Sequence, residues 1–209
     1  MKKTIIIMSL LSTLVLVLYV GLSFYITSLA FQAKRNIPEE TPSDYSLEFE
    51  NVSFNSKDPE KILLEGWWIP SEKNKGTIIW VHGLDSERSG GEGKLEMLKD
   101  INNLGFSVLT FDLRGHGNSG TAPLGLGIRE KNDVYGAINF LKEEKGVSKV
   151  GLWGISYGGV TVIDSAINDP SNTITNVSLD NCSLPLIGQS GNFTGDISTN
   201  NISMFENNV

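Results

Sequence analysis

The stretch that decides the fold is Val150-Gly-Leu-Trp-Gly-Ile-Ser-Tyr-Gly-Gly-Val160. It begins with a short apolar run typical of a buried strand, and the residues after it have the composition of a helix. The turn between them carries the motif G-x-S-x-G, with Ser156 at its centre. In a strand-to-helix turn this serine has a strained backbone and an exposed hydroxyl at the helix N-terminus. The pattern predicts Ser156 as a nucleophile, against the alternative of a glycine-rich turn with a solvent-facing serine.

The glycines of this motif and an upstream loop support the prediction. Gly154 and Gly158 let the helix and the strand approach closely. Acyl transfer also needs two N–H donors for the tetrahedral oxyanion, one after the nucleophile and one from the loop after an earlier strand. The N–H of Tyr157 meets the first requirement. The N–H of Leu84, which follows an apolar run ending in His82-Gly83, is predicted to meet the second.

Outward from the motif, strand-like and helix-like segments alternate. Continuous apolar runs indicate strands covered on both faces, and apolar residues at helical spacing indicate amphipathic helices. This rhythm predicts an α/β fold, a mostly parallel sheet with helices on both faces. We expect strands over 45–54, 62–69, 77–81, 106–111, 150–153 and 176–179, and helices over about 95–104, 134–145 and 160–167.

Three stretches together resemble the α/β-hydrolase superfamily. They are GTIIWVHGLDSE (76–87), GFSVLTFDLRGHGNSG (105–120) and VGLWGISYGGV (150–160), similar to the segments around the third, fourth and fifth strands of that fold. The likeness covers about residues 45–185 and is greatest to membrane-anchored bacterial hydrolases of the serine aminopeptidase S33 or Bem46-like kind. It implies a serine hydrolase without metal or organic cofactor, which acts through an acyl-enzyme on small-molecule esters, thioesters or amides.

The resemblance also implies roles for residues around the motif. His82 and Gly83 shape the loop beneath the site, and His116 organises the glycine-rich loop after the fourth strand. Asp112 is expected as a loop-stabilising acceptor near Arg114. Asp180 is a candidate acid of the triad in a minority arrangement.

The sequence does not supply the general base that this assignment requires. In this fold the triad follows the order Ser, then Asp or Glu, then His, but no histidine follows Ser156. The seventh and eighth strands are not recognisable before Val209. We therefore expect an incomplete hydrolase core over 45–186, followed by a polar loop or the start of a cap over 187–209. We also expect the core alone to be marginally folded and nearly inactive.

Three interpretations of the function remain open. The first is a piece of a membrane-anchored serine hydrolase. The second is a pseudoenzyme, a membrane-tethered binding module that keeps the pocket without the chemistry. The third is another nucleotide- or phosphate-binding α/β domain, which the lack of a G-x-G-x-x-G motif or a Walker lysine disfavours.

The N-terminus has a different character. Residues 4–33 hold no charged side chain, and about 20 apolar residues suffice to cross a bilayer. We expect a transmembrane anchor over 1–35 and a linker over 36–44, with a cleaved signal peptide or a buried helix as alternatives. Lys2, Lys3 and the α-amino group outnumber Lys34 and Arg35 by one charge, which favours a cytoplasmic N-terminus and an extracytoplasmic domain at the cell membrane.

Composition excludes other classes. The 209 residues carry a formal net charge of −7, which argues against a nucleic-acid partner. The single cysteine, Cys182, rules out an internal disulfide and a cysteine-based zinc site. Two histidines leave little room for a histidine-rich metal site.

Overall fold

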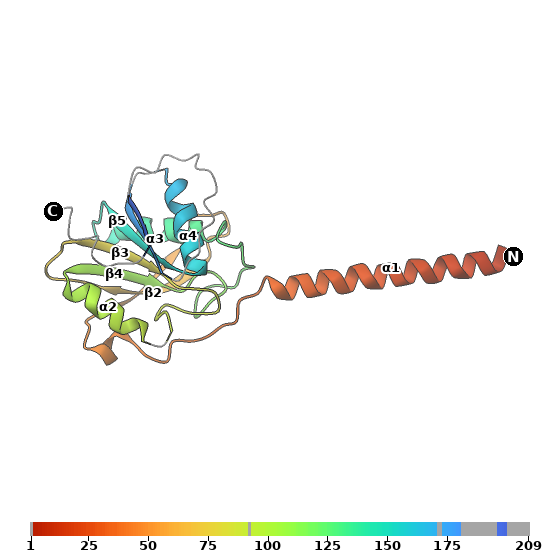
Figure 1. Ribbon diagram of the computed structural model, residues 1–209, viewed down its shortest axis with the longest axis horizontal. Coiled ribbons are helices and arrows are strands. Elements are labelled where there is room, and N and C mark those ends of the chain that lie inside the picture. Colours follow the sequence, from red (N-terminus) through yellow and green to blue (C-terminus); the bar gives the residue numbers. More distant parts are fainter. Residues whose placement is uncertain (1, 92, 171–172, 181–195, 200–209) are drawn as a thin grey trace. The chain divides into compact units, whose positions relative to one another are not determined.

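The computed structural model describes residues 2–91, 93–170, 173–180 and 196–199 (Figure 1). By internal contacts the chain divides into two compact units, Met1–Gln32 and Ala33–Val209. The second unit begins before the predicted linker, so residues 36–44 belong to it.

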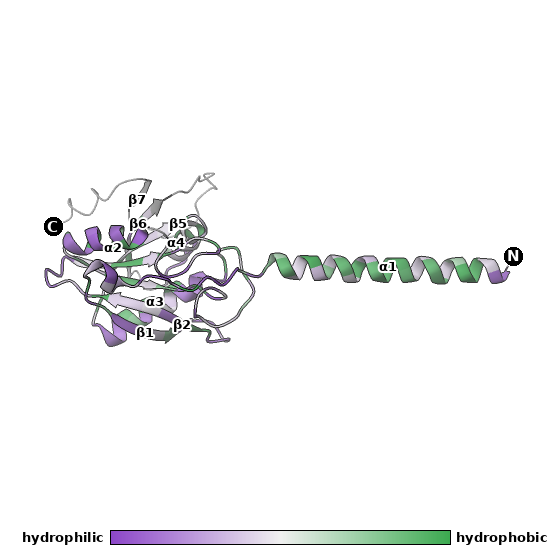
Figure 2. Ribbon diagram, turned by 90° about the horizontal axis from the view of Figure 1, so that it is seen from below, coloured by the Kyte–Doolittle hydropathy of each residue, from purple (hydrophilic) through white to green (hydrophobic). Residues whose placement is uncertain are grey.

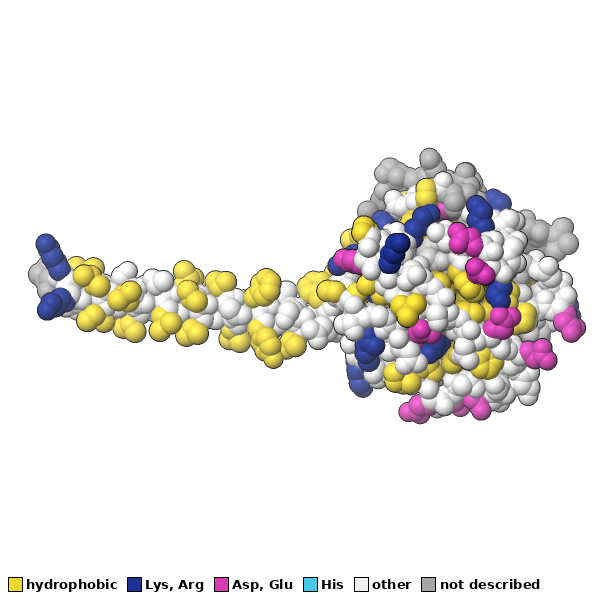
Figure 3. All heavy atoms as spheres, turned by 180° about the vertical axis from the view of Figure 1, so that it is seen from behind, with side chains coloured by type: hydrophobic (Ala, Val, Ile, Leu, Met, Phe, Trp, Pro, Cys, Tyr) yellow, Lys and Arg dark blue, Asp and Glu magenta, His cyan; other side chains and the backbone are white. Residues whose placement is uncertain are grey.

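The first unit is a single helix, α1 (Lys2–Ala30), of 29 residues. None of its side chains is buried, and its surface is hydrophobic along its length with basic residues at the N-terminal end (Figures 2 and 3). It is long and apolar enough to cross a membrane. An N-terminal signal sequence would satisfy the same criterion.

The second unit is built on one sheet of seven strands in the order β1-β2-β4-β3-β5-β6-β7. The strands from β3 to β7 are parallel, whereas β2 is antiparallel to both β1 and β4, so the predicted mostly parallel sheet is confirmed. The bounds are β1 (Glu50–Asn55), β2 (Leu63–Ile69), β3 (Gly76–Val81), β4 (Phe106–Phe111), β5 (Val150–Ile155), β6 (Ile174–Asp180) and β7 (Asp196–Thr199).

Helices cover both faces of this sheet, as the sequence predicted (Figure 1). α2 (Lys94–Asn103) packs on one face, and α3 (Lys131–Glu144) and α4 (Tyr157–Ile167) pack on the other. Side chains of a strand alternate between faces, and β3 shows it: Ile79 joins the core under α3 and α4, while Trp80 joins the core under α2. This is why β3 reads as a continuous apolar run rather than an alternating one.

The predicted strand over 45–54 begins later than expected. Residues Pro42–Tyr45 form a short 3₁₀ helix, η1, and β1 starts only at Glu50. The Asp44 carboxylate accepts hydrogen bonds from the N–H and the hydroxyl of Thr41, and Pro42 occupies the first helical position. This helix-start chemistry outweighs the strand-like composition locally.

A strand also lies where a polar loop or cap was predicted. β7, within the 187–209 segment, pairs in parallel with β6 from Asn176↔Asp196 to Leu179↔Thr199. Composition failed here because strand pairing uses backbone groups, which a polar segment also offers.

A matched pair of leucines tests the core. Leu109 in β4 is fully buried, whereas Leu63 in β2 is half exposed. We expect Leu109→Ala to lower the free energy of unfolding by about 2–5 kcal/mol, because it leaves a cavity. Leu63→Ala should cost under about 1 kcal/mol. Urea denaturation of the full chain in detergent measures both, and equal losses would contradict the assigned core.

Candidate active site

Ser156 lies between β5 and α4 and is exposed. Its backbone angles are φ 51° and ψ −111°, a conformation that non-glycine residues rarely adopt. Because a strained residue persists only where its surroundings hold it, this geometry marks a candidate functional position. It is the conformation that the G-x-S-x-G pattern predicts for a nucleophile elbow.

The glycines on either side make this turn fit. A Cβ at Gly158 would overlap the carbonyl oxygens of Val81 and His82 at the end of β3. A Cβ at Gly154 would lie 2.5 Å from the carbonyl oxygen of Gly158. The start of α4 therefore lies directly against the ends of β3 and β5, and only glycine permits that approach.

The loop after β3 passes beside Ser156. A Cβ at Gly83 would lie 3.6 Å from the Cβ of Ser156. Leu84 follows in this loop, and Tyr157 is the first residue of α4. Among the described residues, neither of their backbone N–H groups donates a hydrogen bond. The two predicted oxyanion donors thus come from segments on either side of Ser156, and both are available.

His82 has no free ring nitrogen. Its Nε2 accepts a hydrogen bond from the N–H of Leu113 at 3.0 Å, and its Nδ1 lies 2.7 Å from the carbonyl oxygen of Gly83. The acceptor role of Nε2 places the proton on Nδ1, so the ring is neutral. Burial, and then the nearby His116, lower the pKa of His82 to about 3. The side chain joins the loop after β3 to the loop after β4.

His116 makes an equivalent connection. Its Nε2 accepts from the N–H of Asp85 at 3.3 Å, and its Nδ1 lies 3.0 Å from the carbonyl oxygen of Arg114. The ring is fully buried, and burial lowers its pKa. Both histidines are thus engaged by backbone groups, and neither presents a nitrogen to Ser156.

Asp112 accepts hydrogen bonds from the backbone of the same loops, the kind of role that the sequence predicted for it. Its carboxylate accepts the N–H groups of Arg88 at 2.7 Å and Asn118 at 2.8 Å. The Nε of Arg88 lies 3.6 Å from Oδ2, so Arg88 is the cation that pairs with this carboxylate. Burial raises the pKa of Asp112, and the Arg88 charge opposes that shift.

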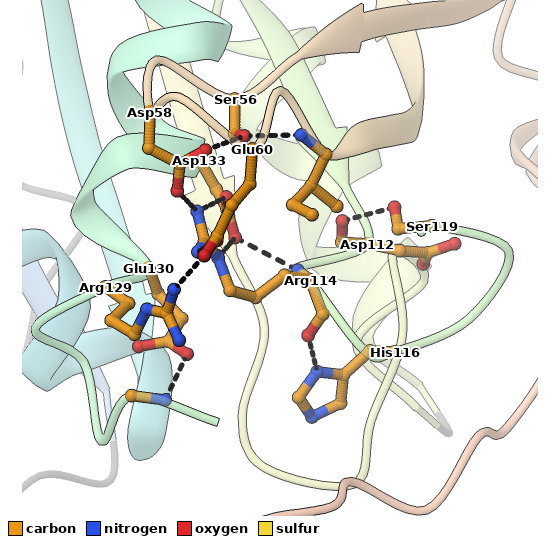
Figure 4. Close-up of polar contacts among 12 residues, drawn as sticks. Ser56, Asp58, Glu60, Asp112, Arg114, His116, Ser119, Arg129, Glu130 and Asp133 are labelled. Atoms are coloured by element: carbon orange, nitrogen blue, oxygen red, sulfur yellow. Dashed lines mark hydrogen bonds and ion pairs between the residues drawn. The ribbon is translucent and has the colours of Figure 1, made fainter. Parts of the chain in front are cut away.

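Arg114 belongs to a buried ion cluster that the sequence did not reveal (Figure 4). Its guanidinium is fully buried and lies 2.7 Å from Asp133 and 2.6 Å from Asp58. Burial disfavours its charge, but the hydrogen bonds to these two carboxylates outweigh burial and raise its pKa. The cluster fixes the loop after β4 to α3 and to the turn after β1.

Glu130 was also missed. Its buried carboxylate accepts the N–H groups of Gly125 at 2.7 Å and Gly127 at 2.9 Å (Figure 4). The Tyr157 hydroxyl is buried nearby without a hydrogen bond of normal geometry. Burial, and then the negative charge of Glu130, raise the pKa of Tyr157. Glu130 therefore holds the 125–127 loop to the start of α3, and its charge acts on Tyr157, the residue that follows Ser156.

Exposed apolar side chains lie on segments that adjoin Ser156 or one another. A Cβ at Gly127 would lie 2.7 Å from Val160 on α4, so the glycine-rich loop lies against the first turn of that helix. The loop after β3 lies beside Ser156 in the same way, through Gly83. These segments together carry one group of exposed apolar residues. We call it the apolar rim; its members are Leu84, Leu126, Ile128 and Val160.

The candidate acid lies in the neighbouring strand. Asp180 ends β6 and is the partner of Ile155, the residue before Ser156. Its side chain lies outside the described residues, as do positions 181–195. In the part of the chain that is described, no three His, Cys, Asp or Glu side chains gather to hold a metal ion.

Comparison with known proteins identifies the family. Residues 72–178, which include both flanks of the site, match the family described as serine aminopeptidase, S33. The chain belongs to this family. The fold neighbours agree: an esterase from Pyrococcus furiosus, Pf2001, superposes with a TM-score of 0.64 at 26% identity, over 70% of this chain and 56% of that one. The predicted α/β-hydrolase fold is thereby confirmed.

The curated relatives align with this chain over less than half of their own length. The S33-family chain is 33% identical over 122 residues to the uncharacterized protein YfhR of Escherichia coli K12, covering 55% of this chain and 40% of that protein. It is 34% identical over 85 residues to the mouse lysophosphatidylserine lipase ABHD12, covering 41% of this chain and 21% of that protein. The chain therefore spans less than half the length of these relatives.

The neutral state of His82 predicts a pH dependence. Below pH 6.5 this histidine binds a proton in the unfolded chain but stays neutral in the folded chain. His82 therefore lowers the free energy of unfolding as the pH falls from 6.5 towards 3. The slope is about 1.4 kcal/mol per pH unit. Ring ¹⁵N NMR at pH 5 should show a neutral His82. In urea denaturation between pH 3 and 6.5, the free energy of unfolding of His82→Gln should depend less steeply on pH than that of the parent chain. A ring that titrates near pH 6.5 would contradict the assignment.

Proposed function

We propose that this S33-family chain presents Ser156 as the nucleophile for acyl transfer. The observation that carries the proposal is the strained, exposed Ser156 at the start of α4, with the Gly83 backbone at its side. A solvent-facing serine in an ordinary turn has no need of this conformation.

The reaction follows from the arrangement. The Ser156 oxygen attacks the carbonyl carbon of an ester, and the N–H groups of Leu84 and Tyr157 stabilise the negative charge on the carbonyl oxygen. The bond to the leaving alcohol then breaks, which leaves an acyl group on Ser156. Water releases this group and restores the hydroxyl.

The substrate class is a small-molecule acyl compound, an ester, thioester or small amide. The apolar rim supports this choice, since exposed apolar side chains beside a nucleophile suit an acyl chain. Relatives named as an esterase and as a lysophosphatidylserine lipase support ester chemistry. The acidic overall charge disfavours phosphate-rich polymers.

Proton removal from Ser156 limits the reaction. His82 and His116 are the two histidines of the sequence, and both are bonded to backbone groups. Loss of a triad histidine costs about 10⁶ in turnover. We therefore infer that these 209 residues by themselves transfer acyl groups slowly. A membrane-tethered binding module that keeps the pocket is the second candidate, and the engagement of both histidines favours it.

Helix α1 is proposed as an uncleaved anchor in the cell membrane through residues 4–33. Lys2, Lys3 and the α-amino group exceed Lys34 and Arg35 by one charge, which supports a cytoplasmic N-terminus. The second unit of the chain (Ala33–Val209), called the hydrolase unit below, would then lie outside.

Labelling with a fluorophosphonate tests the nucleophile. We expect slow covalent labelling of the full chain in its native membrane, no labelling of Ser156→Ala, and unchanged labelling of Ser53→Ala, an exposed serine on β1. Turnover of p-nitrophenyl esters by the same protein should be slow, about 10³–10⁴ times the uncatalysed rate. Labelling that survives Ser156→Ala would refute the nucleophile, and robust turnover would refute the predicted lack of a base.

Protease treatment of intact cells tests the orientation. A protease added outside should digest the hydrolase unit, with an intact cytoplasmic protein as the control. Protection until the membrane is opened would place the unit inside.

A further inference from the structure

The segment that leads into the hydrolase unit is bonded to the loops around Ser156. The backbone N–H of Lys34 donates to the Asp85 carboxylate at 2.7 Å, and the Asn36 side-chain amide donates to the Asp85 carbonyl at 2.6 Å. These partners lie about fifty positions apart in the sequence, so the contacts are built by the fold rather than by proximity along the chain.

Arg35 binds the second loop of the site. Its guanidinium donates to the carbonyl oxygens of Gly117 at 3.2 Å and Ser119 at 2.7 Å, and to the Thr121 hydroxyl at 3.0 Å. The planar guanidinium presents several donors in a fixed geometry, which suits two carbonyls on one loop. Residues 34–36, called the strap below, therefore bridge the 83–86 loop and the 115–121 loop.

Asp85 is the residue on which these contacts converge. It follows Leu84, whose N–H is the proposed oxyanion donor, and its own φ is 55°, in the left-handed region. That conformation is unfavourable for a residue with a side chain. Asp85 is held in it by three bonds: its N–H to His116, its carbonyl to Asn36 and its carboxylate to Lys34. Two of the three come from the strap.

We propose that the strap positions the 83–86 loop, which carries the proposed oxyanion donor Leu84. Lys34, Arg35 and Asn36 are then positioning residues for the Ser156 reaction. This inference rests on the proposed function. Without the strap, Asp85 relaxes towards a right-handed conformation and the Leu84 N–H turns away from the oxyanion position. The segment between the apolar helix and the hydrolase core then does more than connect them: it sets the geometry of the site.

Phenylboronic acid is a probe that needs the oxyanion site but no leaving group. The Ser156 oxygen bonds to boron, its proton passes to water, and no bond to boron breaks. The boron changes from trigonal to tetrahedral, which ¹¹B NMR detects, and a boron-bound oxygen occupies the oxyanion position. We expect Arg35→Ala and Asp85→Ala of the full chain to raise the dissociation constant about tenfold, the loss expected for a displaced donor.

Two variants serve as controls. Asp85→Asn keeps a side-chain acceptor for the Lys34 N–H and should bind within about twofold of the parent chain. Lys145→Ala removes an ion pair with Glu50 on β1 and should also leave binding unchanged. Amide hydrogen exchange over 83–86 gives a second readout, which should accelerate about tenfold in Arg35→Ala and not in Lys145→Ala.

The outcomes separate the two proposals. If the parent chain binds boronate, Ser156→Ala does not, and Arg35→Ala binds normally, the strap is refuted while the nucleophile stands. If no tetrahedral boron signal depends on Ser156, the proposed function fails. In that case, amide hydrogen exchange over 83–86 tests the positioning role of the strap by itself. Faster exchange in Arg35→Ala supports this role, and unchanged exchange overturns it. If Asp85→Ala does not fold, Arg35→Ala and Asn36→Ala carry the test.

Discussion

The close approach of α4 to the ends of β3 and β5 is the constraint on which the site depends. Gly158 lies where any side chain would overlap the carbonyl oxygens of Val81 and His82. This contact turns the chain sharply after β5 and forces Ser156 into its strained conformation. It also brings the helix N-terminus beside the loop after β3. The positions of the proposed nucleophile and of both proposed oxyanion donors follow from one backbone contact.

A second constraint is that parts of the loops around Ser156, above all residues 112–117, are buried. Buried backbone N–H and carbonyl groups need partners, because an unpaired one costs about 1–3 kcal/mol. Polar side chains supply them: His82, His116 and Asp112 bond to backbone groups of a neighbouring loop, and Glu130 bonds to backbone groups of its own loop. Polar residues near the nucleophile therefore need not be catalytic. Most of them shape the loops on which the nucleophile depends.

The sequence predicted those features that are encoded within a few adjacent residues. The apolar runs of β3, β4 and β5 and the strand-to-helix turn at Ser156 are local patterns, and the described fold contains them. Pairings across the sequence were not predictable. The ion pairs of Asp112 with Arg88 and of Arg114 with Asp133 join residues about 20 positions apart, and no local pattern encodes them. The strap contacts went unrecognised for the same reason, since no periodicity encodes them.

The two histidines show why structural and catalytic roles exclude each other here. A general base needs a lone pair aimed at the serine proton, and a neutral imidazole has one such lone pair. In His82 that lone pair accepts the N–H of Leu113, and in His116 it accepts the N–H of Asp85. To serve as a base, either ring would abandon a buried backbone donor and release a loop that holds the oxyanion site. Protonation would also place a charge in a buried position, which the depressed pKa of His82 shows to be unfavourable. The base for Ser156 must therefore be a group that the loops do not require for their own structure.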